Sequence, residues 1–336
     1  MIPMPQVATT KGVDMNSCCY NEEFKATLKP VRLSVIVPVF NDAEVISALY
    51  KRLKPVLEGI CQEHEIILVD DGSSDDSFSI MKNLKDKDDK LVLLKLTRNF
   101  GQSNAITAGL DNARYEYIAI MDSDLQDPPE FLDTLLTACI ENDCDMAIAR
   151  RIQRSDNYLK KLVSAMFNKL SKWMTTIDVK PGMGVFRVMK KSAYDKIRDV
   201  SEVTGTTLSL MYWGGFHYVA VDMHREARHA GSSGYTIRKM FHLAMDRILS
   251  YSLWPLRIAI LTGIATAAAG FILGLVLIIR RLLLSISAPG WTSIVVLMLF
   301  LFGLNFTIIG FMGEYIGRVY LEVKRRPKYI ISKLVK

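Results

Sequence analysis

The sequence lacks the short motifs that identify several large classes of enzyme. Its 336 residues contain neither a Gly-x-x-x-x-Gly-Lys-Ser/Thr pattern nor a Gly-x-Gly-x-x-Gly pattern, so P-loop hydrolysis and dinucleotide redox chemistry lose their usual support. No Gly-x-Ser-x-Gly pattern and no His-Glu-x-x-His pattern occurs either. Any function must therefore be inferred from other features of the chain.

Cysteine is scarce, and its spacing predicts neither a zinc site nor a disulfide framework. The five cysteines are Cys18, Cys19, Cys61, Cys139 and Cys144. Residues 1–30 carry charges and no continuous apolar run, so we expect a flexible extension there and no secretory signal. The net charge of +7 comes without a recognised nucleic-acid motif, so nucleic acid is not an expected partner.

Charge is missing from two long stretches near the C-terminus. Residues 258–279 and 282–313 contain no charged side chain, and each stretch exceeds the roughly 20 residues that cross a bilayer as a helix. Helices buried in a soluble core are usually shorter, so we expect a transmembrane hairpin. Basic residues are more frequent after residue 314 than in the loop between the stretches, which predicts that both termini are cytoplasmic.

Between residues 31 and 230, strand-like and helix-like segments alternate, as in a mostly parallel sheet with helices on both faces. The expected strands are 33–40, 65–69, 91–96 and 117–121, and the expected helices are 43–60, 77–85 and 103–112. Polar residues follow each strand. Because the carboxyl ends of parallel strands share one edge of a sheet, these residues should converge on one crevice.

Asp122 and Asp124 are the most informative of these polar residues. Hard oxygen ligands in such a crevice suit Mg²⁺ or Mn²⁺ bridging the phosphates of a substrate. Alone the pattern is weak, because about one Asp-x-Asp is expected by chance in a chain of this length. The segment 70–73, Asp-Asp-Gly-Ser, fits a nucleotide site but equally fits a turn with a helix cap.

Taken together, the motifs resemble those of family 2 glycosyltransferases of the polyprenyl-phosphate type, such as undecaprenyl-phosphate glucosyl and aminoarabinose transferases and dolichol-phosphate mannosyltransferases. The matching segments are 35–41, 69–73, 98–101, 121–130, 225–239 and 313–327. The resemblance implies a GT-A fold, a nucleotide-sugar donor (most simply a UDP-sugar), a divalent metal and inverting transfer to undecaprenyl phosphate. It also implies a plasma-membrane enzyme that supplies lipid-linked sugar for the cell envelope.

The resemblance assigns roles to individual residues. Asp122 and Asp124 would bind the metal, with Asp127 as a further catalytic candidate that could equally cap the next helix. The nucleotide-sugar would be bound by Pro38, Asn41, Asp70, Asp71, Arg98 and Asp122. The acceptor lipid phosphate would be bound by Arg225, Arg228, Ser233 and Lys239, although any of these cations could instead be solvated.

One position departs from the family pattern. Many relatives carry Asp before Phe-Arg in the segment that reads Gly-Met-Gly-Val-Phe-Arg here, and that Asp is the usual candidate base; this chain has Val185. Asp178 is a weak substitute. A phosphate acceptor has a second pKa of about 6 and is largely a dianionic nucleophile at neutral pH, so transfer need not require the base.

Two amphipathic segments, 159–174 and 237–249, fit either an interfacial helix or ordinary packing on the sheet. We therefore expect a catalytic domain (31–230), an interfacial segment (231–255), two transmembrane helices (256–313) and a basic cytoplasmic tail (314–336). Glycines in the spanning helices would permit a homo-oligomer. The alternatives are a catalytically silent membrane scaffold, favoured by Val185, and a processive synthase, disfavoured because no Gln-x-x-Arg-Trp motif is present.

Overall fold

The structure is a computed structural model, and it describes residues 31–151, 183–200, 206–224, 254–284 and 290–336. These residues belong to two units. One unit contains the sheet and includes residues 326–336, and the other contains two long helices. Arg225, Arg228, Ser233, Lys239 and Asp178 lie outside the described residues, as do both amphipathic segments and the N-terminal extension.

The first half of the sheet unit alternates strands and helices as expected. Its elements are β1 (Arg32–Val39), α1 (Ala43–Ile60), β2 (Glu63–Asp70), α2 (Ser77–Lys85), β3 (Leu91–Leu96), α3 (Gln102–Asn112) and β4 (Tyr117–Ile120). The bounds of α1, α2 and β3 are those predicted from the sequence. Strands β1 and β3 are almost wholly buried, as expected for their nearly continuous apolar runs.

The remaining elements complete the sheet and form the helical hairpin. They are α4 (Phe131–Glu141), β5 (Met146–Arg151), β6 (Met183–Lys190), α6 (Lys191–Asp195), α7 (Thr207–Trp213), β7 (Tyr218–Met223), α9 (Trp254–Leu284), α10 (Trp291–Val323) and β8 (Ile331–Val335).

The eight described strands form one sheet in the order β7-β5-β6-β4-β1-β2-β3-β8. The central strands β4, β1, β2 and β3 are parallel to one another, whereas β6 runs antiparallel to both β4 and β5. The expected mostly parallel sheet is confirmed. The parallel register brings the carboxyl ends of the four central strands to one edge.

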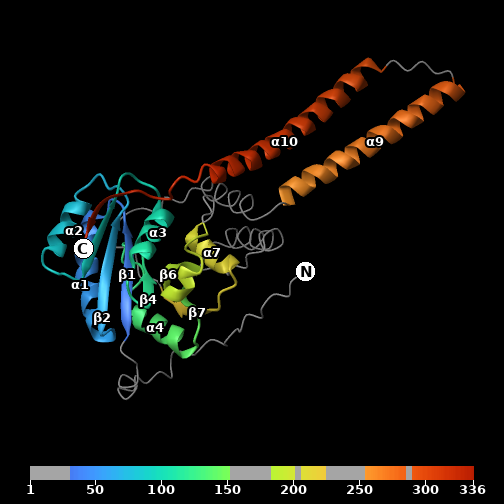
Figure 1. Ribbon diagram of the computed structural model, residues 1–336. Coiled ribbons are helices and arrows are strands. Elements are labelled where there is room, and N and C mark those ends of the chain that lie inside the picture. Colours follow the sequence, from blue (N-terminus) through green and yellow to red (C-terminus); the bar gives the residue numbers. More distant parts are fainter. Residues whose placement is uncertain (1–30, 152–182, 201–205, 225–253, 285–289) are drawn as a thin grey trace. The chain divides into compact units, whose positions relative to one another are not determined.

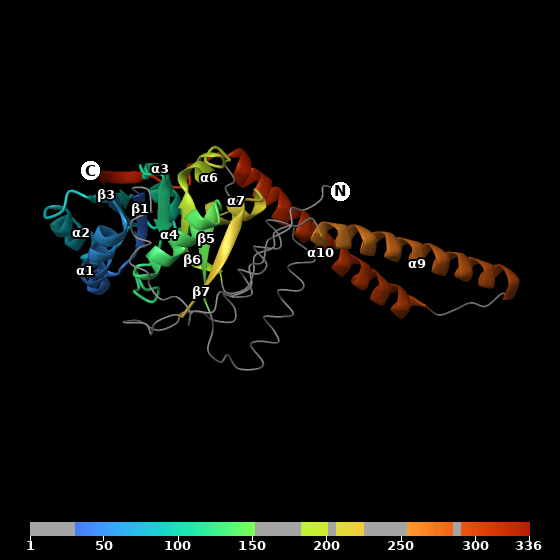
Figure 2. The ribbon, with the colours of Figure 1, turned by 90° about the horizontal axis from the view of Figure 1, so that it is seen from below.

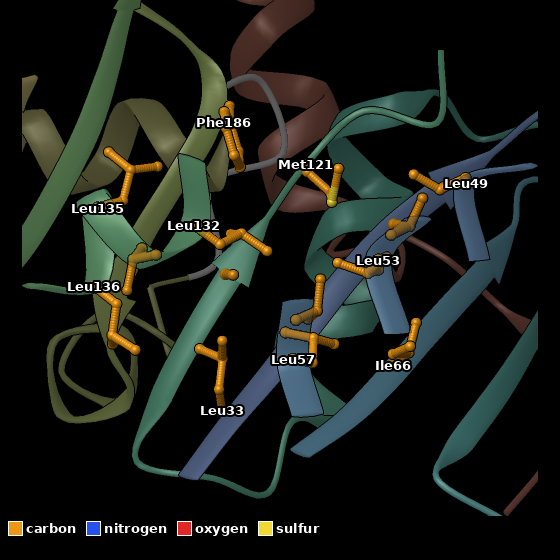
Figure 3. Packing of buried hydrophobic residues seen from close by; sticks show 14 of the residues in the cluster. Leu33, Leu49, Leu53, Leu57, Ile66, Met121, Leu132, Leu135, Leu136 and Phe186 are labelled. Carbon is orange, nitrogen blue, oxygen red and sulfur yellow. The ribbon is translucent and has the colours of Figure 1, made fainter. Parts of the chain in front are cut away.

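Helices cover both faces of this sheet (Figure 1). On one face, α1 buries Ile46, Leu49, Leu53 and Leu57, whose spacing of three or four residues places them on one side of the helix. Burial of each such side chain contributes about 1.5–3 kcal/mol before the entropy cost of ordering it. Figure 3 shows this layer continuing to Met121, to α4 and to β6 through Phe186.

On the other face, α3, α6 and α7 pack over alternate residues of the same strands. The approach of α3 to β1 is close, because a Cβ atom on Gly109 would lie 2.3 Å from Cγ2 of Ile36. A larger residue at position 109 would therefore push α3 away from the sheet. This matters for the site, since α3 begins directly beside it.

The C-terminal residues add an edge strand that the sequence did not predict. Strand β8 pairs antiparallel with β3, and Figure 2 shows it along the edge of the sheet. The backbone N–H of Thr97 also donates to the carbonyl of Ile330 at 3.0 Å. Part of the segment expected as a basic tail thus belongs to the catalytic sheet.

In the second unit, α9 and α10 pack against each other and are long and apolar enough to cross a membrane. The candidate spans are Ile258–Val276 and Phe300–Val323. Almost none of either window is buried, unlike the core helix of a soluble protein. Helix α10 continues ten residues beyond the predicted end of the second span, and within that extension Arg318 pairs with Glu314 at 3.0 Å.

Candidate active site

The site is built from loops that follow β1, β2, β3 and β4 at their shared edge. The first of these loops turns at Asn41, whose φ of 56° lies in the left-handed region that asparagine tolerates better than most residues. Its side-chain oxygen accepts a hydrogen bond from the N–H of Ser74 at 2.9 Å, and its own N–H donates to Oγ of Ser73 at 3.0 Å. Asn41 therefore joins the loops after β1 and β2.

Asp42 joins the first loop to the loop after β4. Oγ of Ser123 donates a hydrogen bond to its carboxylate at 2.5 Å. The backbone N–H of Asp42 donates to Oγ of Ser77 at 3.0 Å. Three of the four loops are thus tied together by short polar side chains, which fixes their positions at this edge of the sheet.

Asp70 is fully buried and shapes its own turn. Oδ1 accepts from the N–H of Ser73 at 2.9 Å, and Nζ of Lys95 lies 3.8 Å from Oδ2, which has no hydrogen-bond partner in the described part of the chain. The turn that the sequence allowed as an alternative is therefore present. A helix cap is not, because the cap position of α2 is Asp76 and no side chain bonds there.

Asp71 is also buried and shapes the loop after β3. Its two oxygens accept from the N–H groups of Phe100 at 2.7 Å and Gly101 at 2.9 Å. Burial raises the pKa of Asp71, and the two amide donors oppose that rise. The contacts of Asp70 and Asp71 show loop-building roles, and direct contact with a nucleotide stays a prediction for both.

Two further residues predicted to bind the nucleotide-sugar differ in exposure. Pro38 is buried inside β1, paired with Val69. Arg98 is exposed in the loop after β3, and its guanidinium lies 4.4 Å from the centre of the Phe100 ring. Of the two, only Arg98 presents its side chain at the surface of the site.

Asp122 and Asp124 follow β4 directly. The carboxylate of Asp122 accepts from Nε2 of Gln102, at the start of α3, at 2.7 Å, and Nη2 of Arg151 lies 3.4 Å away. Asp124 accepts from the N–H of Gln126 at 3.2 Å. The next residue, Leu125, is buried with a φ of 56°, a strained conformation for a bulky side chain.

Arg151 is a residue of this site that sequence reasoning missed. It ends β5, and its Nη2 donates to Asp127 at 2.7 Å as well as to Asp122. Burial opposes its charge, but Asp127 and Asp122 outweigh this effect and raise the pKa of Arg151. The only available sequence signal was a basic residue at the end of a strand.

Asp127 is almost completely buried and faces Arg151. The alternative of a helix cap is wrong, since α4 begins at Phe131 with Glu130 in the cap position and no side chain bonded there. Its predicted catalytic role remains a prediction. The structure gives it a partner, the guanidinium that also contacts Asp122.

Val185 lies near the beginning of β6, at the position where the family pattern described above has a carboxylate. Its backbone oxygen accepts from Nε of Arg187 at 3.1 Å. Two residues further on, Arg187 pairs with Ile120 of β4, so Val185 lies beside the segment that leads to Asp122. The structure places an apolar side chain at this point of the site.

The described residues contain no group of three or more His, Cys, Asp or Glu side chains arranged to hold a metal ion by themselves. Asp122 and Asp124 nevertheless fit a metal ion that takes its remaining ligands from a substrate and from water. Mg²⁺ is usually bound through one or two carboxylates, with substrate phosphates and water completing the octahedron. The donor set fits a metal that arrives with a diphosphate substrate.

Comparison with known proteins agrees with this picture. Residues 34–198 match the model of glycosyl transferase family 2. The chain is 35% identical to the uncharacterized glycosyltransferase YkcC of Bacillus subtilis, covering 90% of this chain and 94% of that one. It is 37% identical to the SfII prophage-derived bactoprenol glucosyl transferase of Shigella flexneri, covering 90% and 98%.

Among solved structures, mannosyl-3-phosphoglycerate synthase from Rubrobacter xylanophilus is similar with a TM-score of 0.46 at 14% identity, covering 66% of this chain and 73% of that one. The sheet, its acidic edge and the full-length relatives define the class of protein: the chain is a glycosyltransferase with a GT-A-like fold. Within that class it belongs to glycosyl transferase family 2.

Proposed function

We propose that this glycosyltransferase moves one sugar from a UDP-sugar to undecaprenyl phosphate at the plasma membrane. The observation that carries the proposal is a single chain that joins Asp122 and Asp124 at the sheet edge to two apolar helices long enough to span a bilayer. Its similarity to a bactoprenol glucosyl transferase extends over both parts. A polyprenyl acceptor requires this combination, because its phosphate must reach the sugar while its tail stays in lipid.

On the donor side, Asp122 and Asp124 would hold Mg²⁺ or Mn²⁺ against the diphosphate. The bound metal would supply charge stabilisation for the leaving diphosphate. Gln102 orients the carboxylate of Asp122 by its 2.7 Å hydrogen bond, and Arg151 adds a positive charge beside it. Asn41, Asp70 and Asp71 hold the loops that would surround the nucleotide, and the exposed Arg98 would meet a phosphate.

On the acceptor side, Arg225, Arg228, Ser233 and Lys239 would bind the lipid phosphate. Its dianionic form attacks the anomeric carbon opposite the leaving diphosphate, which inverts the configuration. Val185 cannot accept a proton, and none needs to be removed from a phosphate dianion. The apolar side chain is therefore compatible with transfer to a phosphate and would be a poor substitute in transfer to a sugar hydroxyl.

The proposed location is inferred from charge. Basic residues after α10 favour a cytoplasmic C-terminus, and a two-helix hairpin would leave the sheet unit on the same side of the membrane. Undecaprenyl phosphate and UDP-sugars would meet there, at a multi-pass protein of the inner membrane. The product would serve modification of a surface glycan on the other side of the membrane.

The test is transfer of label from a panel of UDP-sugars into the organic phase, with purified protein, undecaprenyl phosphate and Mn²⁺ or Mg²⁺. We expect metal-dependent label from one donor, loss of that label with EDTA, and at least a hundredfold loss of rate in Asp124→Ala. A folded protein that binds UDP but labels no lipid from any donor would overturn the proposal and favour the scaffold.

A further inference from the structure

Arg187 is a buried cation whose contacts are unusual. It is 3% exposed in β6, and no carboxylate pairs with it in the described part of the chain. Its Nη2 donates to the carbonyl of Gly184 at 2.7 Å and its Nε to that of Val185, while the ring of Tyr212 lies 5.6 Å from Cζ. Burial lowers the pKa of Arg187, and Tyr212 opposes that fall. Burying a cation costs free energy, so these two backbone carbonyls are held at some expense to stability.

Gly184, the first of the two residues held in this way, lies against the guanidinium of Arg151. A Cβ atom on Gly184 would lie 2.9 Å from Cζ of Arg151 and 3.0 Å from its Nε and Nη2. The backbone of Gly184 is outside the left-handed region, so an alanine could adopt it. The three atoms nearest to such a Cβ all belong to the guanidinium of Arg151.

We propose that Arg187 and Gly184 position Arg151. Arg187 fixes the carbonyl groups at the start of β6, and Gly184 offers a surface without a side chain on which the guanidinium of Arg151 lies. From there Arg151 reaches Asp127 at 2.7 Å and Asp122 at 3.4 Å. The inference rests on the proposed function only in taking Asp122 as part of the donor site.

A side chain at position 184 should therefore affect binding of the donor diphosphate. A methyl group at position 184 must move the flexible end of Arg151, which then alters the positive charge beside Asp122 and the direction of its carboxylate. We expect Gly184→Ala to weaken binding of UDP with Mn²⁺ about tenfold, a loss equivalent to about 1.4 kcal/mol. Gly59→Ala is the matched control, because a Cβ there meets nothing within 4 Å.

A double-mutant cycle separates positioning from general damage. In the Arg151→Met background, Gly184→Ala should change neither UDP–Mn²⁺ affinity, measured by titration calorimetry, nor the thermal midpoint of the full-length protein. The proposal would be overturned if Gly184→Ala lowered UDP–Mn²⁺ affinity equally in the wild-type and Arg151→Met backgrounds. It would also be overturned if Gly184→Ala bound UDP–Mn²⁺ as Gly59→Ala does. The thermal midpoint keeps the cycle measurable if Arg151→Met binds no nucleotide.

Arg187→Lys tests the part of the proposal that concerns Arg187. Lysine keeps the charge but lacks the planar fork that reaches two carbonyls, so UDP–Mn²⁺ affinity should fall in this variant and not fall further when Gly184→Ala is added. If the losses of UDP–Mn²⁺ affinity in Arg187→Lys and Gly184→Ala were additive in the double mutant, the two residues would not act through the same arginine. Wild-type protein that binds UDP–Mn²⁺ but labels no lipid would refute the proposed acceptor and leave this proposal standing, so the two failures are distinguishable.

Discussion

The hydroxyl of Tyr329 donates a hydrogen bond to the carboxylate of Asp111 at 2.6 Å, across 218 positions of sequence. Asp111 lies in α3 and also accepts from Tyr194 at 2.8 Å and from Arg198 at 3.0 Å. Burial, together with the nearby carboxylate, raises the pKa of Tyr329 and keeps it a donor throughout the physiological range. The chain just before β8 is thereby attached to the helix that begins beside Asp122.

We expect Tyr329→Phe to loosen β8. A hydrogen bond to a charged group contributes about 1.5–3 kcal/mol, and Asp111 keeps two other donors, so the loss should be about 1–2 kcal/mol. Brief trypsin digestion followed by mass spectrometry should show faster cleavage after Lys333, which lies within β8.

The control is Tyr320→Phe, since Tyr320 is exposed on α10 and its ring contacts Lys324. It should leave cleavage after Lys333 unchanged. Equal cleavage rates in wild type and Tyr329→Phe would show that the hydroxyl does not hold the strand.

A second prediction separates two carboxylates that were both predicted to be catalytic, Asp127 with a helix cap as an alternative. Asp127 is 1% exposed and pairs with Arg151, whereas Asp124 is only partly buried. Asp127→Asn should lower the unfolding free energy by about 2–3 kcal/mol, because it leaves a partly buried guanidinium with a weaker partner. Asp124→Asn should unfold within about 0.5 kcal/mol of wild type yet lose at least a hundredfold in transfer rate. Thermal unfolding without ligand, beside the transfer assay, measures both, and the reverse order of stabilities would contradict the assignment.

The third prediction concerns the contact between the loops after β2 and β3. Gly72 has a φ of +72°, and a Cβ there would lie 2.5 Å from the backbone carbon of Arg98. Gly101 also has a positive φ, of +92°, but a Cβ there would meet nothing within 4 Å. Gly101→Ala therefore reports conformational strain alone, about 1–2 kcal/mol, and Gly72→Ala should cost at least 1 kcal/mol more. Similar thermal midpoints for the two variants would mean that the loops separate easily.

Much of the sheet could be predicted because its signals are local. The apolar runs of β1 to β4 and the amphipathic pattern of α1 are contained in their own segments, and the polar residues after each strand follow from chain order. Strand β8 could not be predicted, because its five residues include a lysine and gain their stability from pairing with β3, more than 230 positions away. Its local pattern is no stronger than that of a basic tail.

In the site, too, the sequence positions of the residues could be predicted, but their tertiary partners could not. The sequence places Arg150 and Arg151 together at the end of β5, but neighbouring side chains on a strand point to opposite faces. Arg150 pairs with Asp222 of β7, and Arg151 turns toward Asp122 and Asp127. Likewise, residue type could not show that the carboxylate of Asp71 accepts two backbone amides. Only the tertiary arrangement separates carboxylates that build loops from those that the proposed function assigns to a ligand.

The last prediction concerns the dependence of stability on pH. Asp88 accepts from Nζ of Lys54 at 2.8 Å, from the hydroxyl of Tyr50 at 2.6 Å and from the N–H of Lys90 at 3.0 Å. Burial alone would raise its pKa, but these donors outweigh burial and lower the pKa of Asp88 to about 2. A carboxyl group with a pKa below its unfolded value of about 3.9 stabilises the fold above that pH and loses this contribution as the pH falls toward 2.

Asp88→Asn should therefore lower the unfolding free energy by about 1.5–2 kcal/mol at pH 7, and its difference from wild type should shrink between pH 4 and pH 2. Thermal midpoints in detergent over that range measure the effect. Asp89→Asn is the matched control, because the side chain of Asp89 is fully exposed and its nearest cation lies 3.9 Å away. A difference for Asp88→Asn that stays constant down to pH 2 would show that the neutral carboxyl serves as well as the carboxylate, and that the bonds to Lys54 and Tyr50 do not depend on its charge.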